Sequence, residues 1–208
     1  MSGGTVPPHR TTGRFAAIVS PSPLLRAGSS QLLIVDVQAR LLPAMGDAAA
    51  AACRRALTLL AVAADQLGVP VTVTEHVPHQ LGSTDPDLLA ALPEPCVFDK
   101  VRFGATGEAP IREHLSRLER PQVVVAGLET HVCVLQTVLG LLQAGLRPAV
   151  VANACRSRLE EDHERALDRM GRHGADILTA DMVAFEWLHR ADHPARRAVI
   201  AAVKAAAG

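Results

Sequence analysis

Three side chains capable of acid–base or nucleophilic chemistry follow apolar, β-branched runs, at points where strands are expected to end. Asp36 closes "LLIVD", Lys100 closes "CVFDK", and Cys133 comes a few residues after "QVVVAG". The carboxyl ends of parallel strands meet at one edge of a sheet, where ligands bind, so we expect these side chains to converge. A carboxylate beside a thiol removes its proton, and a lysine keeps that carboxylate ionised. Together the three residues predict nucleophilic catalysis by a thiol.

Each of these residues also has a purely structural interpretation. Cys133 lies near the expected start of a helix, where the helix dipole lowers a thiol pKa, but a small buried cysteine at a helix–sheet junction is equally common. Asp36 would otherwise cap a loop, and Lys100 would otherwise be a surface lysine. Cys155 is a weaker candidate nucleophile, because no glycine-marked helix entry precedes it. The combination therefore carries more weight than any one residue.

The elements that position these residues alternate between strand and helix. Apolar, β-branched runs predict strands at "QLLIVDVQ", "VPVTVTE", "CVFDK", "QVVVAG", "RPAVVANA" and "ADILTA", and the intervening patterns predict helices over about 47–67, 108–118, 132–144 and 161–172. Asp47 and Thr179 stand where helix N-caps belong, and Gly68 and Gly145 stand where left-handed C-caps belong. This alternation predicts an α/β fold: a three-layer, doubly wound, mostly parallel sheet of about six strands.

The composition narrows the function classes. The chain has 208 residues, with 21 Lys+Arg against 21 Asp+Glu. Because these charges balance, we expect no strong positive electrostatic potential that would attract nucleic acid. No apolar run is long enough for a membrane helix, and the four cysteines form no CxxC pair, which favours a cytoplasmic protein. Residues 1–29, rich in Gly, Pro, Ser and Thr, are expected to form a loosely ordered extension, and residues 30–208 one domain.

Several motifs, in order and spacing, resemble the isochorismatase-like cysteine hydrolase superfamily. They are "LLIVDVQARLLPAM", "VTEHVPHQLGSTDPDL", "DKVRFGA", "GLETHVCVLQTVLGLLQAGLRPAVVANACRSR" and "ALDRMGRHGADILTADM". The segment "TEHVPHQLGST" is more similar to the branch with a "TEQYPxGLGxT" pattern, whose activities are largely unassigned, than to the nicotinamidase branch.

The resemblance implies a catalytic triad of Asp36, Lys100 and Cys133. It also implies a cis peptide at Leu128–Glu129 and an oxyanion hole formed by the backbone N–H groups of Glu129 and Cys133. The implied reaction is hydrolysis of a small amide, ureido or imide-like substrate through a thioester, without a cofactor. Two alternatives stay open. One is acid-catalysed vinyl-ether hydrolysis of the isochorismatase type, and the other is a non-catalytic metabolite-binding or thiol-sensor protein.

The pocket and partners follow from the same reasoning. Gln38, Glu75, His76 and Phe103 are expected to line the substrate pocket. The nicotinamidase metal motif "DxH…H" is missing, because this chain reads "TEHVPH", so we expect no metal at His76 and His79. Family members are often oligomers, so the expected partners are a small-molecule substrate and other copies of the chain, with no nucleic acid and no membrane.

Overall fold

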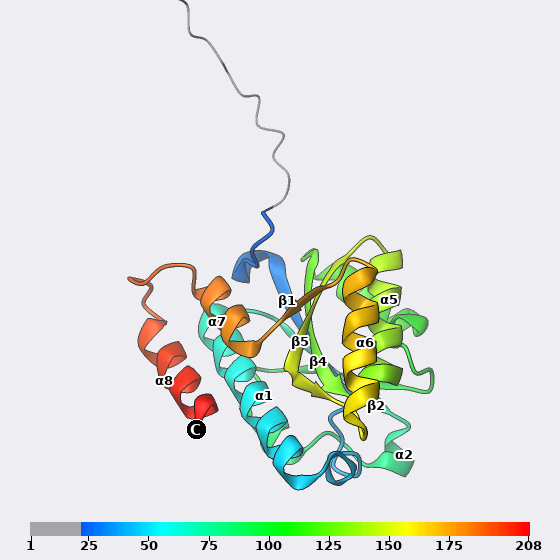
Figure 1. Cartoon of the computed structure of the whole chain (residues 1–208). Helices are drawn as coiled ribbons and strands as arrows, with labels where there is room; N and C mark the ends of the chain where they lie inside the picture. Colours follow the sequence, from blue (N-terminus) through cyan, green and yellow to red (C-terminus); the bar gives the residue numbers. More distant parts are fainter. Residues whose placement is uncertain (1–21) are drawn as a thin grey trace, which may run out of the picture.

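A computed structural model describes residues 22–208, which form a central sheet with helices on both faces (Figure 1). All six strands are parallel, in the order β3-β2-β1-β4-β5-β6. The chain therefore reverses its winding direction between β1 and β4, so the predicted three-layer α/β fold is confirmed. The strands are β1 (Ser30–Val35), β2 (Val71–His76), β3 (Cys96–Lys100), β4 (Gln122–Leu128), β5 (Arg147–Arg156) and β6 (Asp176–Leu178).

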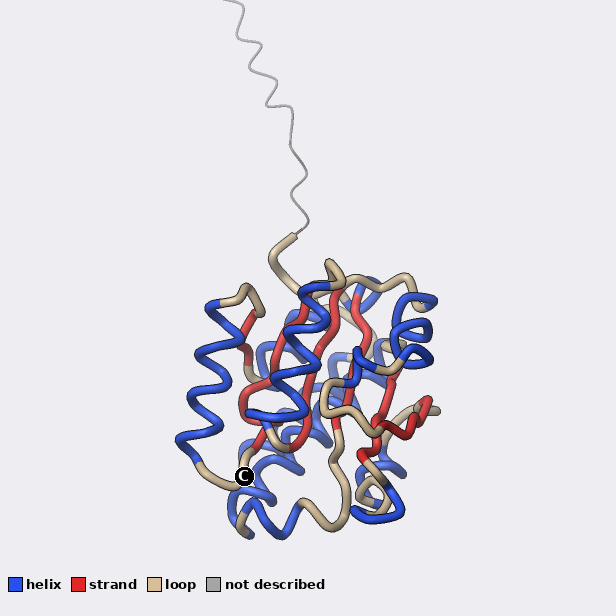
Figure 2. Tube along the Cα trace, turned by 90° about the vertical axis from the view of Figure 1, so that its right-hand side faces the viewer, coloured by secondary structure: helices blue, strands red, loops and turns tan. Residues whose placement is uncertain are grey.

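The helices divide between the two faces of the sheet (Figures 1 and 2). Buried side chains of α1, α7 and α8 pack in one core, and those of α4, α5 and α6 pack in the other. The short helices α2 and α3 lie in the connection from β2 to β3. The helices are α1 (Asp47–Leu67), α2 (Pro78–Leu81), α3 (Pro86–Ala91), α4 (Ala109–Arg117), α5 (Leu135–Gln143), α6 (Glu160–Arg172), α7 (Ala180–Leu188) and α8 (Arg196–Ala207).

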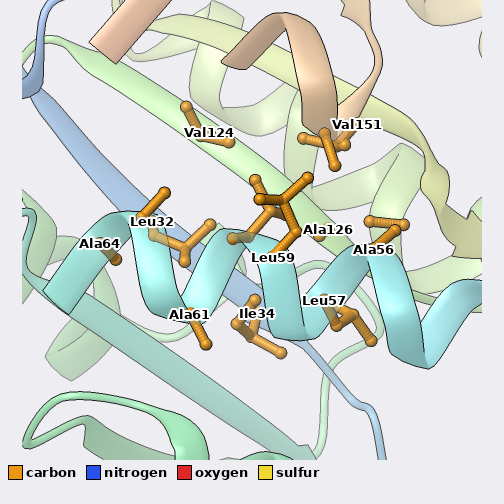
Figure 3. Close-up of a cluster of buried hydrophobic side chains, with 14 of the residues drawn as sticks. Leu32, Ile34, Ala56, Leu57, Leu59, Ala61, Ala64, Val124, Ala126 and Val151 are labelled. Carbon is orange, nitrogen blue, oxygen red and sulfur yellow. The ribbon is translucent and has the colours of Figure 1, made fainter. Parts of the chain in front are cut away.

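Strand β1 lies at the centre of the sheet and contributes side chains to both hydrophobic cores. Leu32 and Ile34 point to the α1 side, where they meet side chains such as Leu57 (Figure 3). Leu33 and Val35 point to the opposite core. Because both faces are covered, the strand is apolar from Leu32 to Val35 without polar alternation, as expected for a parallel sheet. The first polar residue after it, Asp36, therefore marks the carboxyl edge.

The predicted helix ends are correct in part. Helix α1 spans the expected residues and ends at Gly68, which has a left-handed φ of 63°. Gly145, just after α5, has a φ of 77°. The Thr179 side chain caps α7, but Asp47 is not an N-cap. Gly46 occupies that position, and Asp47 is the first helical residue, where its carboxylate faces the positive end of the helix dipole.

The loosely ordered extension expected over residues 1–29 lies, for residues 1–21, outside the described part of the chain. Of the described remainder, Leu25 is buried, and its backbone N–H donates to the Glu186 carboxylate at 2.7 Å. The Arg26 N–H donates to the Gln122 side chain at 2.8 Å. These bonds tie the segment before β1 to α7 and β4. Among the described helices, none has the length and apolarity needed to cross a membrane.

Glycine at position 127 lets β1 and β4 come together at the carboxyl edge. Gly127 pairs with Val35 in the sheet and has a φ of 149°. A Cβ at this position would lie 2.0 Å from the Val35 carbonyl oxygen, so no other residue fits without moving a strand. The β4–β5 register also shifts between Val125 and Gly127. This close approach brings the residues after β1 and β4 to the same place.

Candidate active site

Asp36 and Lys100 form an ion pair that is completely removed from solvent. The Lys100 Nζ lies 2.7 Å from the Asp36 Oδ2, and both side chains have 0% exposure. Asp36 has a left-handed φ of 53°, a conformation that Asp and Asn tolerate better than most residues. Its other carboxylate oxygen, Oδ1, accepts a 2.8 Å hydrogen bond from the Thr74 hydroxyl. The carboxylate is thus held in a single orientation.

The Lys100 ammonium is enclosed by three acceptors and also lies beside the Cys133 thiol. Besides its ion pair with Asp36, it donates to the backbone carbonyls of Arg102 at 3.1 Å and Phe103 at 2.8 Å. An ammonium has three N–H donors, and three acceptors surround it. Lys100 therefore neutralises the Asp36 charge and fixes the loop after β3.

Cys133 opens onto the same cavity as Asp36, and its pKa is raised rather than lowered. Burial is the main cause of a rise to about 12, and the Asp36 charge adds to it, while the Lys100 charge opposes it. The residue is only 5% exposed, so the low dielectric penalises the thiolate. The expected depression of this pKa is therefore wrong. Cys133 is a thiol in the resting protein, and it needs a base to become a nucleophile.

The helix that carries Cys133 begins differently from the prediction. It starts with a π-helical turn, Thr130–Val134, and becomes α-helical only at α5. No cis peptide occurs among the described residues, so the cis bond expected at Leu128–Glu129 is not present. Instead, Glu129 turns the chain with a left-handed φ of 56° and ψ of 62°. Wide π turns are frequent at functional sites, and this one directs the Cys133 thiol into the cavity beside Asp36.

Two backbone N–H groups mark this turn. The Glu129 N–H has no backbone acceptor among the described residues. Cys133 lies in the first turn of the helical run that begins at Thr130. Both groups therefore belong to a helix entry of the kind that binds negative charge.

The cavity above these groups has a volume of about 480 Å³ and mostly apolar walls. Two of the four expected pocket residues, His76 and Phe103, line it, with their ring centroids 5.2 Å apart. The complete lining is Asp36, Leu41, Ala44, His76, Leu81, Phe103, Glu129, Val132, Cys133 and Arg158. The cavity thus joins a thiol and a buried carboxylate to a small apolar chamber.

Gln38 and Glu75 do not line this cavity, although both are buried at the same edge. The Gln38 amide donates to the carbonyls of His76 and Gly82, at 3.0 and 2.5 Å, and accepts from the His76 N–H at 2.8 Å. One Glu75 carboxylate oxygen accepts from both the N–H and the hydroxyl of Thr84, at 2.7 Å each. Both side chains hold the loop after β2 in place, because a buried polar group has to find a partner.

Sequence reasoning missed some residues of the site and misplaced others. Thr74 was not anticipated, although it is the polar residue near the end of "VTVT", on the strand next to Asp36. The apolar wall residues carry no distinctive sequence pattern. Asn153 and Cys155 both lie within β5. The Asn153 side chain accepts from the Ala180 N–H at 2.9 Å, and Cys155 is fully buried, so neither reaches the cavity.

An ion pair between Glu129 and Arg158 closes one side of the cavity. The Arg158 Nε lies 3.0 Å from Glu129 Oε1, and Nη2 lies 3.5 Å from Oε2. The arginine side chain is 61% exposed, and the glutamate side chain is 10% exposed. His131 lies 3.6 Å from the same carboxylate. These contacts hold the backbone turn at Glu129 in place from its solvent-exposed side.

Two other kinds of site were sought in the described residues: a group of metal ligands and a cavity that carries an acid or a thiol. Among the described residues, no three His, Cys, Asp or Glu side chains are grouped to hold a metal ion. A hollow of about 530 Å³ between α1 and α8 is lined by alanines, apolar side chains, Thr58, Arg54 and Arg55, without an acid or a thiol. The chemistry of the described chain therefore concentrates at the carboxyl edge of the sheet.

A family model and the curated relatives of this chain point to the same family. A family model described as "Isochorismatase domain" matches residues 30–182. Isochorismatase domain-containing protein 2 of Bos taurus is 38% identical over 128 residues, which are 62% of this chain and 61% of the bovine protein. The matched region thus covers about three fifths of that relative.

Solved structures agree in fold. The MAR1 ribonuclease of Caenorhabditis elegans superposes with a TM-score of 0.81 at 30% identity, over 87% of this chain and 92% of that one. The YcaC protein of Escherichia coli, described as an octameric hydrolase of unknown specificity, superposes with a TM-score of 0.79 at 24% identity, over 89% and 90% of the two chains. At that identity, YcaC indicates the fold alone.

Proposed function

Because the chain belongs to the isochorismatase family, a family of hydrolases, we propose that it is a cysteine-dependent hydrolase of a small amide, ureido or imide-like substrate. One observation carries this proposal. A buried carboxylate, neutralised by a buried lysine, shares a cavity with a thiol at a helix entry. A thiol used only as a sensor needs neither the acid nor the ion pair. The catalytic residues in this proposal are Asp36, Lys100 and Cys133.

In the proposed reaction, Asp36 takes the proton of the Cys133 thiol as the sulfur attacks the substrate carbonyl carbon. The C–N bond then breaks, Asp36 returns the proton to the leaving amine, and an acyl thioester remains on the sulfur. Water hydrolyses the thioester to the acid and regenerates the thiol. The raised pKa of Cys133 fits this order of events, because proton transfer accompanies attack and no resting thiolate is required.

The N–H groups of Glu129 and Cys133 are the proposed oxyanion hole. Donors of this kind each contribute about 2.7–4 kcal/mol of transition-state stabilisation in acyl-transfer enzymes. The Arg158 ion pair and the left-handed conformation of Glu129 fix the corner from which the first donor points. Lys100 lies beside this site, and its positive charge favours negative charge on the Cys133 sulfur.

The cavity limits the substrate to a small molecule with an apolar portion. Leu41, Leu81 and Val132 supply apolar walls, and Phe103 supplies the one aromatic ring apart from His76. A polyanion such as RNA, suggested by the name of the C. elegans relative, fits less well, because the cationic groups at the site are already paired with Asp36 and Glu129. We therefore propose a single small amide, not a polymer, as the substrate.

The proposed thioester is the first prediction. A panel of small amides, ureides and imides is screened for ammonia or amine release, and reactions with a turned-over compound are quenched in acid. We expect mass spectrometry to find the acyl portion on the peptide that contains Cys133, in a form that hydroxylamine removes. Cys96, which is exposed and distant in sequence, serves as the internal control and should stay unmodified. Turnover with no adduct during a pre-steady-state burst would contradict the mechanism.

We also propose a homo-oligomer and a cytoplasmic location. The exposed apolar side chains Met182 and Phe185 on α7 support an assembly. All four cysteines are unpaired, which supports a reducing compartment. Light scattering on the full chain should give a mass that is a multiple of 22.0 kDa, and a mass of one chain would contradict the assembly.

A further inference from the structure

Hydrolysis of the proposed thioester needs a base that water can reach. Asp36 has 0% exposure, and its two carboxylate oxygens face Thr74 and Lys100. Water arrives from the cavity side. Glu129, the other carboxylate in the lining, is ion-paired with Arg158.

His76 is the remaining proton acceptor in the cavity lining, and the structure holds it firmly. Gln38 binds both of its backbone groups, accepting from the N–H at 2.8 Å and donating to the carbonyl at 3.0 Å. The imidazole ring packs against Phe103 with an interplanar angle of 38°. Its position is thus set by β2, by the loop after β1 and by the loop after β3.

The surroundings of the His76 ring favour its neutral form, and Nε2 is not used for structure. Burial lowers the pKa of His76 below its ordinary 6.5, and the Lys100 charge lowers it further, against the opposing effects of the Asp36 charge and the Lys100 backbone carbonyl. Nδ1 is buried and has no hydrogen-bond partner within the described chain. No hydrogen bond among the described residues engages Nε2, the nitrogen farther from the backbone. A fixed, neutral imidazole without structural bonds is suited to general-base work.

We propose that His76 is the general base for hydrolysis of the acyl–Cys133 thioester, a role that rests on the proposed function. The oxygen of a water molecule bonds to the thioester carbonyl carbon while its proton moves to His76 Nε2. Collapse of the tetrahedral intermediate breaks the C–S bond, and the sulfur takes up the proton from His76. The products are a carboxylic acid, the Cys133 thiol and neutral His76. Asp36 serves the first half of the reaction, and His76 serves the second.

The experiment uses p-nitrophenyl acetate as an acylating probe, so the natural substrate is not needed. The full chain is acetylated, excess reagent is removed, and loss of the acetyl group from the Cys133 peptide is followed by mass spectrometry. We expect His76→Gln to slow deacetylation by at least about 100-fold, the lower bound of general-base contributions. His79→Gln is the matched control, because His79 is exposed and does not line the cavity. It should behave like the unmodified protein.

The pH dependence of the deacetylation rate distinguishes a general base from a residue with a purely structural role, because only a general base has to be deprotonated. Deacetylation of the unmodified protein should be fast above the His76 pKa and should fall as pH drops through that value, below 6.5, because the protonated ring accepts no proton. His76→Gln should lose this step. Equal deacetylation rates in the two proteins overturn the role of His76 and leave the thioester mechanism intact. If Cys133 cannot be acetylated at all, both proposals fall.

Discussion

Replacing Cys133 with alanine is expected to abolish turnover and to leave the fold intact. The substitution removes the only atom of the cavity that can form the thioester, and loss of a catalytic nucleophile costs on the order of 10⁶-fold in kcat in well-studied hydrolases. Alanine fits the helical turn that carries the residue, so we expect stability to fall by only about 1 kcal/mol. Amide turnover and urea unfolding measure the two effects separately.

Two further variants sharpen this test. Cys96→Ala removes an exposed cysteine on β3 and should keep full activity. Cys133→Ser keeps the size of the side chain but replaces the thiol with a far less acidic hydroxyl. Near-normal turnover by Cys133→Ser would contradict nucleophilic catalysis and would favour acid-catalysed hydrolysis of the isochorismatase type, with Asp36 as the acid.

Asp36→Asn is expected to remove both activity and stability. Asparagine tolerates the left-handed backbone at this position, so the substitution removes the charge without backbone strain. Loss of the base should reduce turnover by about 10²–10⁴-fold. Lys100, with 0% exposure, would keep a buried charge without its counterion, which should cost about 3–5 kcal/mol of unfolding free energy. Turnover and the urea midpoint report these two losses.

The same variant should separate base catalysis from thiolate formation. The Asp36 charge raises the pKa of Cys133, and the Lys100 charge lowers it. Asp36→Asn should therefore lower this pKa, which the pH dependence of Cys133 alkylation by iodoacetamide measures, although turnover is lost. An unchanged or higher pKa would contradict this direction. Asp99→Asn, an exposed carboxylate next to Lys100 in the sequence, is the control and should change neither this pKa nor turnover.

A double variant identifies the origin of the stability loss. Lys100→Met combined with Asp36→Asn removes both buried charges and replaces the ammonium with an apolar side chain of similar length. Stability should recover most of the loss, while turnover should stay low, because the base is still absent. A double variant as unstable as Asp36→Asn alone would show that the Thr74 hydrogen bond, and not the unpaired lysine, causes the loss.

Local patterns in the sequence were sufficient for the fold and for the location of the site. Helices cover both faces of β1, so its residues 32–35 are apolar on both faces. The sequence shows this as the uninterrupted apolar run "LLIV". Helix α1 ends where a glycine permits a left-handed φ. Asp36 and Lys100 follow their strands as predicted, since the carboxyl ends of parallel strands share an edge. Residues near one another in sequence decide each of these features.

The state of the catalytic groups depends on residues that are distant in sequence. The pKa of Cys133 is raised because burial and the Asp36 charge outweigh the Lys100 charge, and these residues follow three different strands. Two of the acceptors around Lys100 are backbone carbonyls of the loop after β3. Gln38 and Glu75 were polar residues at the right edge, yet they hold loops instead of lining the cavity.

The sequence alone therefore determined which side chains come to the carboxyl edge of the sheet, because strand and helix periodicity is local. Only the tertiary structure decided which way those side chains point, which of their hydrogen-bond donors and acceptors remain free, and which protonation state each favours. Burial and electrostatic energy sum over neighbours from β1, β2, β3 and β4, so His76 and Cys133 acquire their chemistry only when those strands have come together.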